Sequence, residues 1–227
     1  MGLRNKIIAE FFGTTLLLAT VVGSGIMGVN LSQGNNGVAL LANAAATAGI
    51  LYVLITTLAP ISGAHFNPAV SLVMRARGEL GNRELIFYLL AQITGAIVGV
   101  LLAHAMFEQT LIQPGIRIRT GIPQYLSEAT ATFGLLITIL LAAKQKSTQV
   151  PALVASYIFA AYWFTSSTSF ANPAVTIARS LTQSFAGIRP DDVTGFVAAQ
   201  LLGACMAYLF FRFAFGFTSS SAGSSAK

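Results

Sequence analysis

The sequence predicts an all-α membrane protein of six transmembrane helices plus two re-entrant half-helices, arranged as an inverted repeat of three helices and three. Three observations lead to this prediction: an apolar composition with few charges, six long apolar runs, and short motifs that occur twice in the same order. We expect a single domain over residues 1–217, with repeats at about 7–107 and 125–213. Residues 218–227, which are rich in Ser and Gly, are expected to form a disordered tail.

The composition excludes the usual soluble classes of protein. Of the 227 residues, 55% are hydrophobic and only 9% are charged, and the mean hydropathy is +0.72. A soluble domain carries about 25% charged residues, so this chain could not cover its surface with charge in water. The net charge of +6 comes from basic residues that stand singly between apolar runs. This pattern argues against nucleic acid as a partner.

Each apolar run is long enough to cross a membrane, or nearly so, as a helix. A span needs about 20 residues, and the runs are continuous rather than alternating, which favours helices over barrel strands. The predicted spans are residues 7–29, 37–59, 84–106, 125–143, 151–164 and 193–215. The first run is too long for a cleaved signal peptide and contains Glu10.

The Lys and Arg distribution predicts that both termini are cytoplasmic. With the N-terminus inside, nine of the 13 basic residues fall in inner segments and four in outer segments, as the positive-inside rule expects. The four outer residues are Arg117, Arg119, Arg179 and Arg189.

Three motifs recur in the same order along the chain. The recurring residues are Glu10 and Thr14 with Glu128 and Thr132, then Asn67, Pro68 and Ala69 with Asn172, Pro173 and Ala174, then Gln92 and Gly95 with Gln200 and Gly203. The offsets are 118, 105 and 108 residues, which are similar enough to indicate an internal repeat. Because each repeat holds three spans, the second is inverted in the membrane, and such repeats place a transport pathway at the midplane.

Each Asn-Pro-Ala motif predicts a re-entrant loop followed by a half-helix. The segments 61–65 and 165–171 look irregular, and the apolar stretches 68–74 and 173–181 that follow are too short to span a bilayer. Asn before Pro is the signature of a helix N-cap followed by the first helical residue. Irregular backbone at membrane depth occurs only where it is buried in protein or lines water. The two loops are therefore expected to meet near the middle of the membrane.

Such a meeting point favours uncharged solutes. Each half-helix N-terminus carries about half a positive charge, and two that face one passage repel cations and protons. Capping by the side-chain oxygens of Asn67 and Asn172 would leave their amide N–H groups pointing at the passage. The loop carbonyls of residues 62–65 and 167–170 would supply acceptors on either side.

These motifs resemble those of the major intrinsic protein family, the aquaporins and aquaglyceroporins, over about residues 7–213. Residues 62–70, Ser-Gly-Ala-His-Phe-Asn-Pro-Ala-Val, are very similar to the family's first loop signature. The resemblance implies six tilted helices and two half-helices per subunit, in a homotetramer whose subunits each enclose a pore. It also implies that Glu10 and Glu128 are buried scaffold residues that accept N–H groups of the loops, and that His65 is a hydrogen-bonded structural residue. No catalytic residue, metal site or cofactor is expected.

The position after the second motif departs from the family pattern. Most members have an arginine there, where this chain has Val175. Spacing transfers the other three positions of the family's constriction to Thr47, Ala160 and Ser169, with Ala161 or Tyr162 as alternatives to Ala160. This selectivity filter would be wide, uncharged and free of arginine.

Arg179 has two interpretations. It shares a helix face with Asn172 and Val175, so it could stand at the outer mouth and replace part of the missing charge. Alternatively, it could snorkel to the outer membrane interface, and we favour this second interpretation. Arg117 and Arg119, with Glu108 in the same connector, are expected in or near the outer vestibule.

Val175 and the residues that follow it, Thr-Ile-Ala-Arg, resemble the bacterial aquaporin S-type aquaglyceroporins associated with arsenic-resistance operons. This resemblance implies a passive channel in the lipid of a bacterial inner (plasma) membrane that passes arsenous acid, methylarsenicals, glycerol-like solutes and water. Two alternatives remain open: an ordinary water or glycerol facilitator, and a structural membrane protein with a non-conducting pore. An enzyme is not expected.

Overall fold

The computed structural model describes residues 1–216, which form eight α-helices and no strand in that range. The helices are α1 (Leu3–Leu31), α2 (Asn36–Ser62), α3 (Pro68–Ala76), α4 (Asn82–Met106), α5 (Ile122–Lys144), α6 (Val150–Phe164), α7 (Pro173–Arg179) and α8 (Pro190–Phe215). Helices α1, α2, α4, α5 and α8 are long and apolar enough to cross a membrane, and α6 is a shorter apolar helix of 15 residues. The predicted tail, 218–227, lies outside the described residues.

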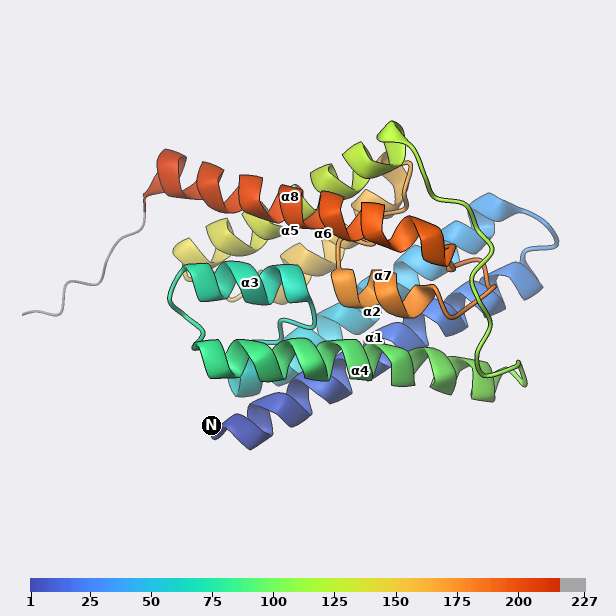
Figure 1. The fold of residues 1–227 in the computed structure, drawn as a ribbon, viewed down its shortest axis with the longest axis horizontal. Helices are drawn as coiled ribbons and strands as arrows, with labels where there is room; N and C mark the ends of the chain where they lie inside the picture. Colours follow the sequence, from blue (N-terminus) through green and yellow to red (C-terminus); the bar gives the residue numbers. More distant parts are fainter. Residues whose placement is uncertain (217–227) are drawn as a thin grey trace, which may run out of the picture.

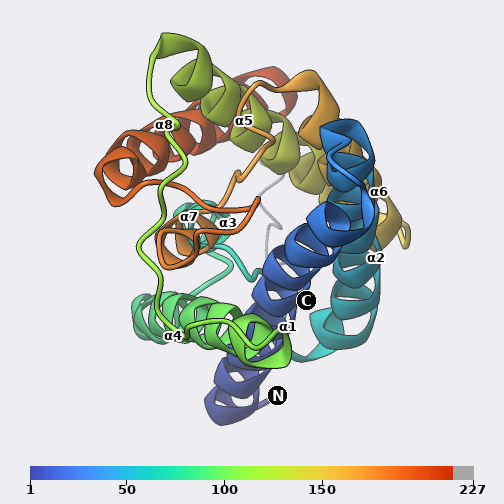
Figure 2. The same ribbon diagram turned by 90° about the vertical axis from the view of Figure 1, so that its right-hand side faces the viewer.

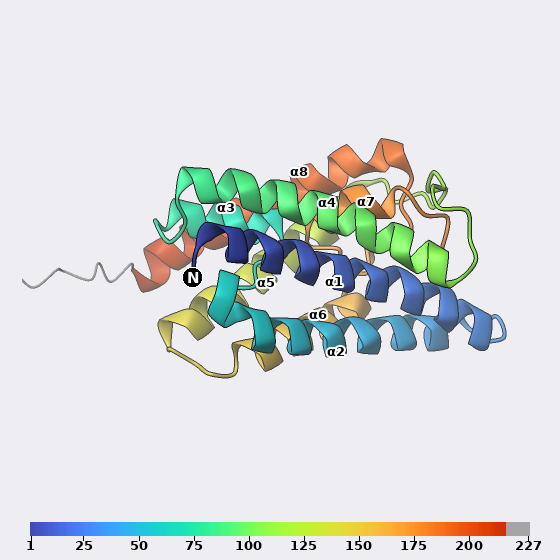
Figure 3. The ribbon, with the colours of Figure 1, turned by 90° about the horizontal axis from the view of Figure 1, so that it is seen from below.

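The two halves of the chain pack in the same way, as the repeat predicts. In the first half α1 contacts both α2 and α4, and in the second α5 contacts both α6 and α8. Contacts between α2 and α6 join the halves on one side of the bundle (Figure 2). Both ends of the described chain lie at the same end of the bundle (Figure 3), which an even number of crossings requires.

The short helices α3 and α7 lie in line between α4 and α8, with their N-termini toward each other (Figure 1). Each contacts both long helices. Asn67 Oδ1 accepts the Ala69 N–H at 2.9 Å, and Asn172 Oδ1 accepts the Ala174 N–H at 3.0 Å. Both half-helices thus begin with the predicted Asn cap and Pro.

Glycine allows the long helices of each half to approach closely. A Cβ placed on Gly95 of α4 would lie 2.6 Å from the carbonyl oxygen of Phe11 in α1. A Cβ on Gly203 of α8 would overlap the carbonyl oxygen of Ala129 in α5. Since both pairs stand at matching places in the repeat, the glycines of the recurring motif serve helix packing in both halves.

Several helix ends differ from those expected by a few residues, and the ends of α2 and α7 concern the re-entrant segments. We expected irregular backbone from residue 61, but α2 continues through Pro60 to Ser62 and ends where Gly63 takes a left-handed φ of 89°. A glycine that can adopt this conformation is a common helix terminator. Helix α7 ends at Arg179 rather than at residue 181, with Ser180 as its C-cap.

Candidate transport pore

The two re-entrant loops are joined by a crossed pair of hydrogen bonds. Asn67 Nδ2 donates to the carbonyl oxygen of Ala171 at 2.8 Å, and Asn172 Nδ2 donates to that of Phe66 at 2.8 Å. Each acceptor is the residue directly before the other asparagine. Phe66 and Ala171 both have a φ of 49°, in the sparsely populated left-handed region. One amide N–H of each asparagine is therefore used to hold the loops together, and both residues also line a cavity.

Glu10 holds the first loop from inside the protein. Its side chain is fully buried, and Oε1 accepts the Ser62 hydroxyl at 2.7 Å and the His65 N–H at 2.9 Å. Oε2 accepts the Phe66 N–H at 2.7 Å and the Gln92 amide at 2.8 Å. A buried carboxylate needs such donors, because an unpaired charge would be strongly destabilising there.

Glu128 holds the second loop in the same way. Its side chain is fully buried and accepts the N–H groups of Phe170 and Ala171, each at 2.9 Å. It also accepts the Gln200 amide at 2.6 Å. Neither Glu10 nor Glu128 lines the cavity described below.

Gln92 and Gln200 complete these two clusters, a role that was not predicted from the sequence. Gln92 Nε2 also donates to the Ser71 hydroxyl at 2.9 Å, and Gln200 Nε2 to the Thr176 hydroxyl at 2.8 Å. Each glutamine therefore connects a loop-holding glutamate to its half-helix. The signal for this role was present in the sequence, because both glutamines belong to a recurring motif.

The two histidines each bridge two segments. His65 Nδ1 lies 3.0 Å from the Ser71 hydroxyl, and its ring meets Tyr88 edge-on with 5.4 Å between the ring centres. His65 also lines the cavity. His104, which sequence reasoning left without a role, is fully buried. Its ring nitrogens lie 2.7 Å from the Leu111 carbonyl oxygen and 2.8 Å from the Thr182 hydroxyl.

One cavity is lined by both halves of the chain. Asn67, Asn172 and three of the four expected filter residues, Thr47, Ser169 and Val175, all line it. Most of the remaining wall is aliphatic, including Leu17, Val21, Leu51, Ile55, Leu135, Ile139, Val154 and Ile158. The cavity therefore combines apolar walls with a few polar groups from the loops, as small-solute sites commonly do.

Ala160 was wrongly expected in this wall. It is exposed on the outside of α6 and does not line the cavity, whereas Tyr162 does and is 3% exposed. The cavity face of α6 consists of every fourth residue: Val150, Val154, Ile158 and Tyr162. Ala160 is two residues away from both Ile158 and Tyr162, so it points to the opposite side of the helix. Counting back from Asn172 could not anticipate the path of the intervening loop.

Arg179 does not snorkel to the interface. It is 1% exposed and lines the cavity. Its guanidinium carbon lies 3.3 Å from the centre of the Phe170 ring, and Nε donates to the carbonyl oxygen of Ala186. The segment after α7 folds back over this arginine and encloses it. The lining is thus not free of arginine, although Val175 itself carries no charge.

Arg119, in the connector between α4 and α5, also contacts the Phe170 ring. Its side chain is 5% exposed, and its guanidinium donates to the carbonyl oxygens of Gly187 at 2.9 Å and Ser167 at 2.8 Å. It stacks on Phe170 at 4.7 Å from the ring centre. Burial, followed by the charges of Arg179 and Arg117, lowers the pKa of Arg119 to about 9. The group remains charged at neutral pH, so this region is electropositive.

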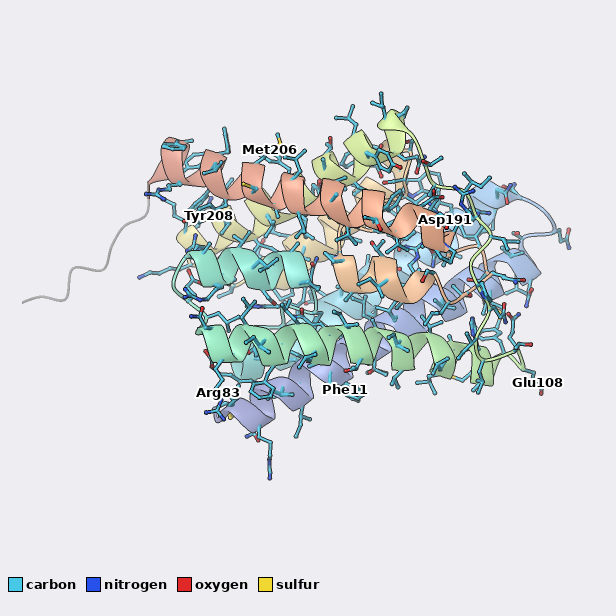
Figure 4. The ribbon with its side chains drawn as sticks, viewed as in Figure 1. Phe11, Arg83, Glu108, Asp191, Met206 and Tyr208 are labelled. Atoms are coloured by element: carbon cyan, nitrogen blue, oxygen red, sulfur yellow. The ribbon has the colours of Figure 1, made fainter. Side chains whose placement is uncertain are left out.

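Glu108 of this connector and Asp191 of α8 lie at the same end of the bundle (Figure 4). Figure 4 shows Glu108 and Asp191 toward one end and Arg83 near the other. Arg117 is exposed and lies over the Phe185 ring at 4.7 Å.

Comparisons with known proteins agree with this architecture. The model of the family described as "Major intrinsic protein" matches residues 1–167. The chain is 53% identical over 210 residues to a protein named Aquaglyceroporin AqpS from Rhizobium meliloti, covering 92% of this chain and 90% of the relative. It is 36% identical over 102 residues to Aquaporin Z of Brucella melitensis, covering 45% of this chain and 44% of that protein.

Among solved structures, the aquaglyceroporin from Plasmodium falciparum matches with a TM-score of 0.74, covering 92% of this chain and 96% of that chain. At 16% sequence identity this likeness concerns the fold. The family match over most of the chain and the full-length similarity to a bacterial relative lead to one conclusion: the chain belongs to the major intrinsic protein family.

Proposed function

We propose that this protein is a passive channel for small uncharged solutes with a wide outer filter, and that these solutes include water, glycerol, arsenous acid and methylarsenicals. As a member of its family it is a membrane channel and not an enzyme. The observation that carries the proposal is the single cavity lined by Asn67, Asn172, Thr47, Ser169 and Val175. It brings polar groups from both halves of the chain into one apolar passage.

The polar groups of the wall suit hydroxylated solutes. The hydroxyl of Ser169 is buried and has no hydrogen-bond partner in the described part of the chain, so it can bond to a solute. Val175 takes up less of the passage than an arginine would and demands no acceptor from the solute. Arsenous acid is neutral near pH 7 and presents three hydroxyls, as glycerol does. Such a molecule can exchange its water for wall groups without carrying a charge into the apolar passage.

In this proposal, fixed positive charge along the pathway excludes cations and protons. The N-termini of α3 and α7 point toward each other, and each carries about half a positive charge. We assign Arg179 to the outer mouth, where its guanidinium replaces part of the charge missing at Val175. Its burial in the cavity wall supports this assignment.

In the same proposal the protein is a homotetramer in the bacterial inner membrane, surrounded by lipid, with both termini in the cytoplasm. The orientation is supported by the excess of Lys and Arg at the inner end. The position of both described chain ends at one end of the bundle agrees with it.

Purified protein in liposomes tests the proposal. Stopped-flow light scattering would follow water efflux and then uptake of glycerol and larger polyols, and arsenic analysis of filtered vesicles would follow arsenous acid and methylarsenicals. We expect all of these solutes to enter faster than into protein-free liposomes. Flux of water alone, or of water and glycerol only, would identify an ordinary facilitator. Absence of any flux from correctly folded protein would identify a structural protein with a closed pore.

A further inference from the structure

Tyr162 is placed in the cavity wall by a bond that crosses between the two halves of the chain. Its hydroxyl lies 3.2 Å from the Thr47 hydroxyl, which belongs to α2. The two residues are 3% and 4% exposed, and both line the cavity. In the described part of the chain, this is the one side-chain hydrogen bond between the cavity faces of α2 and α6.

The direction of this hydrogen bond follows from the partners of Thr47. Thr47 Oγ1 donates its only proton to the Asn43 carbonyl oxygen at 2.8 Å. The Tyr162 hydroxyl must therefore donate to Thr47 Oγ1. Asn43 is itself tied to α1, because its amide donates to the Val21 carbonyl oxygen at 2.8 Å. Tyr162 is thus held by a rigid acceptor, and its own oxygen keeps free lone pairs.

Those lone pairs lie in an electropositive part of the cavity. Arg179 lines the same cavity as Tyr162, and Arg119 stacks on Phe170, which lines it too. Arg179 offers only donors, whereas Tyr162 with its proton committed to Thr47 offers only acceptors. A solute hydroxyl can satisfy both, since it donates to one side and accepts from the other.

We propose that Tyr162, held by its hydroxyl against Thr47, determines which solutes pass the outer half of this pore. The ring limits the width, and the hydroxyl pair favours solutes that carry O–H groups. This inference rests on the proposed channel function. It selects Tyr162 from the three positions that spacing left open in this span and assigns a role to its hydroxyl.

Two kinds of substitution distinguish the effect of the Tyr162 hydroxyl from the effect of its ring. Tyr162→Phe keeps the ring but loses the bond to Thr47 and the acceptor, and Thr47→Val removes the same bond from the other side. We expect each to lower glycerol flux relative to water flux by about fivefold, roughly the effect of one hydrogen bond. Because both remove one interaction, the double variant should differ little from either single variant. Tyr162→Ala removes the ring and should instead raise the flux of larger polyols relative to water.

One matched control is another tyrosine of α6, and the other is a milder substitution of Thr47. Tyr157 is also in α6, but its hydroxyl donates to the Ala131 carbonyl oxygen at 3.1 Å and the residue does not line the cavity. Tyr157→Phe should leave the glycerol-to-water ratio unchanged. Thr47→Ser keeps a hydroxyl and should restore most of the ratio lost in Thr47→Val.

All variants would be compared at equal amounts of folded protein in the same liposomes. Absence of flux from the unmodified protein would overturn the channel function itself. If the unmodified protein conducts, an unchanged ratio in Tyr162→Phe and Tyr162→Ala would overturn the role of Tyr162. Additive losses in the double variant would show that Thr47 and Tyr162 act separately, which also contradicts the proposal.

Discussion

In the wall of the cavity, the central carbon of the Arg179 guanidinium lies 3.3 Å from the centre of the Phe170 ring. Phe170 belongs to the second re-entrant loop, and its N–H donates to Glu128 at 2.9 Å. The same loop that ends at the second asparagine therefore also contacts a charged group of the cavity wall. This link between loop and charge is the basis of the first prediction.

Replacing Arg179 by Met should increase proton leak while uncharged solutes still pass. The loss of one fixed positive charge in a poorly hydrated passage should raise the leak by about tenfold. A pH-sensitive dye inside liposomes with an imposed pH gradient would measure it. Arg117→Met is the matched control, because Arg117 is in the connector between α4 and α5 but is exposed and does not line the cavity. Equal leak in both variants would show that the effect comes from overall surface charge.

Replacing Glu10 by Gln should destabilise the protein more than it impairs conduction by the folded fraction. One carboxylate oxygen becomes an NH₂ group that cannot accept the loop N–H groups, and bonds to a buried charged group are each worth about 1.5–3 kcal/mol. Thermal unfolding in detergent would measure the loss. Glu84→Gln is the control, since Glu84 is a partly exposed ion-pair partner of Lys6 at 2.8 Å, and such pairs are worth about 0.2–1 kcal/mol. Normal stability with abolished flux in Glu10→Gln would refute the scaffold role.

Replacing Val175 by Arg should reduce the flux of glycerol-sized and larger solutes, including methylarsenicals, much more than that of water. The new side chain would narrow the passage and place a second guanidinium one helical turn from Arg179. Val175→Leu should give a milder version of the same order, because it acts through size alone. The liposome swelling series measures both. Equal loss of water and glycerol flux would point to a misfolded loop, and no change would mean that Val175 does not limit passage.

Replacing Gly95 or Gly203 by Ala should lower stability by about 1–3 kcal/mol, as overpacking in a tight contact does. The added methyl would meet a carbonyl oxygen of the neighbouring helix in each case. Gly49→Ala in α2 is the matched control, because a Cβ there meets nothing within 4 Å and alanine favours the helix. Unfolding midpoints in detergent would compare the three. A loss of stability in Gly49→Ala equal to that in Gly95→Ala would contradict the packing argument.

The bundle and the meeting of the loops could be predicted because their signals are local. The apolar runs indicate spans by length, and Asn67 before Pro68 indicates a capped helix start in a segment too short to cross. The recurrence of these signals in the second half then requires the inverted arrangement. The glutamines in the recurring motif show the limit of this reasoning. Their repetition could be seen in the sequence, but their bonds to Glu10 and Glu128 join residues 82 and 72 positions apart.

Which side of a helix faces the cavity is decided by tertiary packing. Composition cannot distinguish Ala160 from Tyr162, because the choice depends on the rotation of α6 and on the path of the loop that follows it. Arg179 likewise became part of the wall only because Ala186 and Phe170, from two separate loops, enclose it. Helices and caps arise from interactions within a few residues of the chain, so a short stretch of sequence is enough to predict them. The lining of the pore arises from packing between distant segments, and only their arrangement in space determines it.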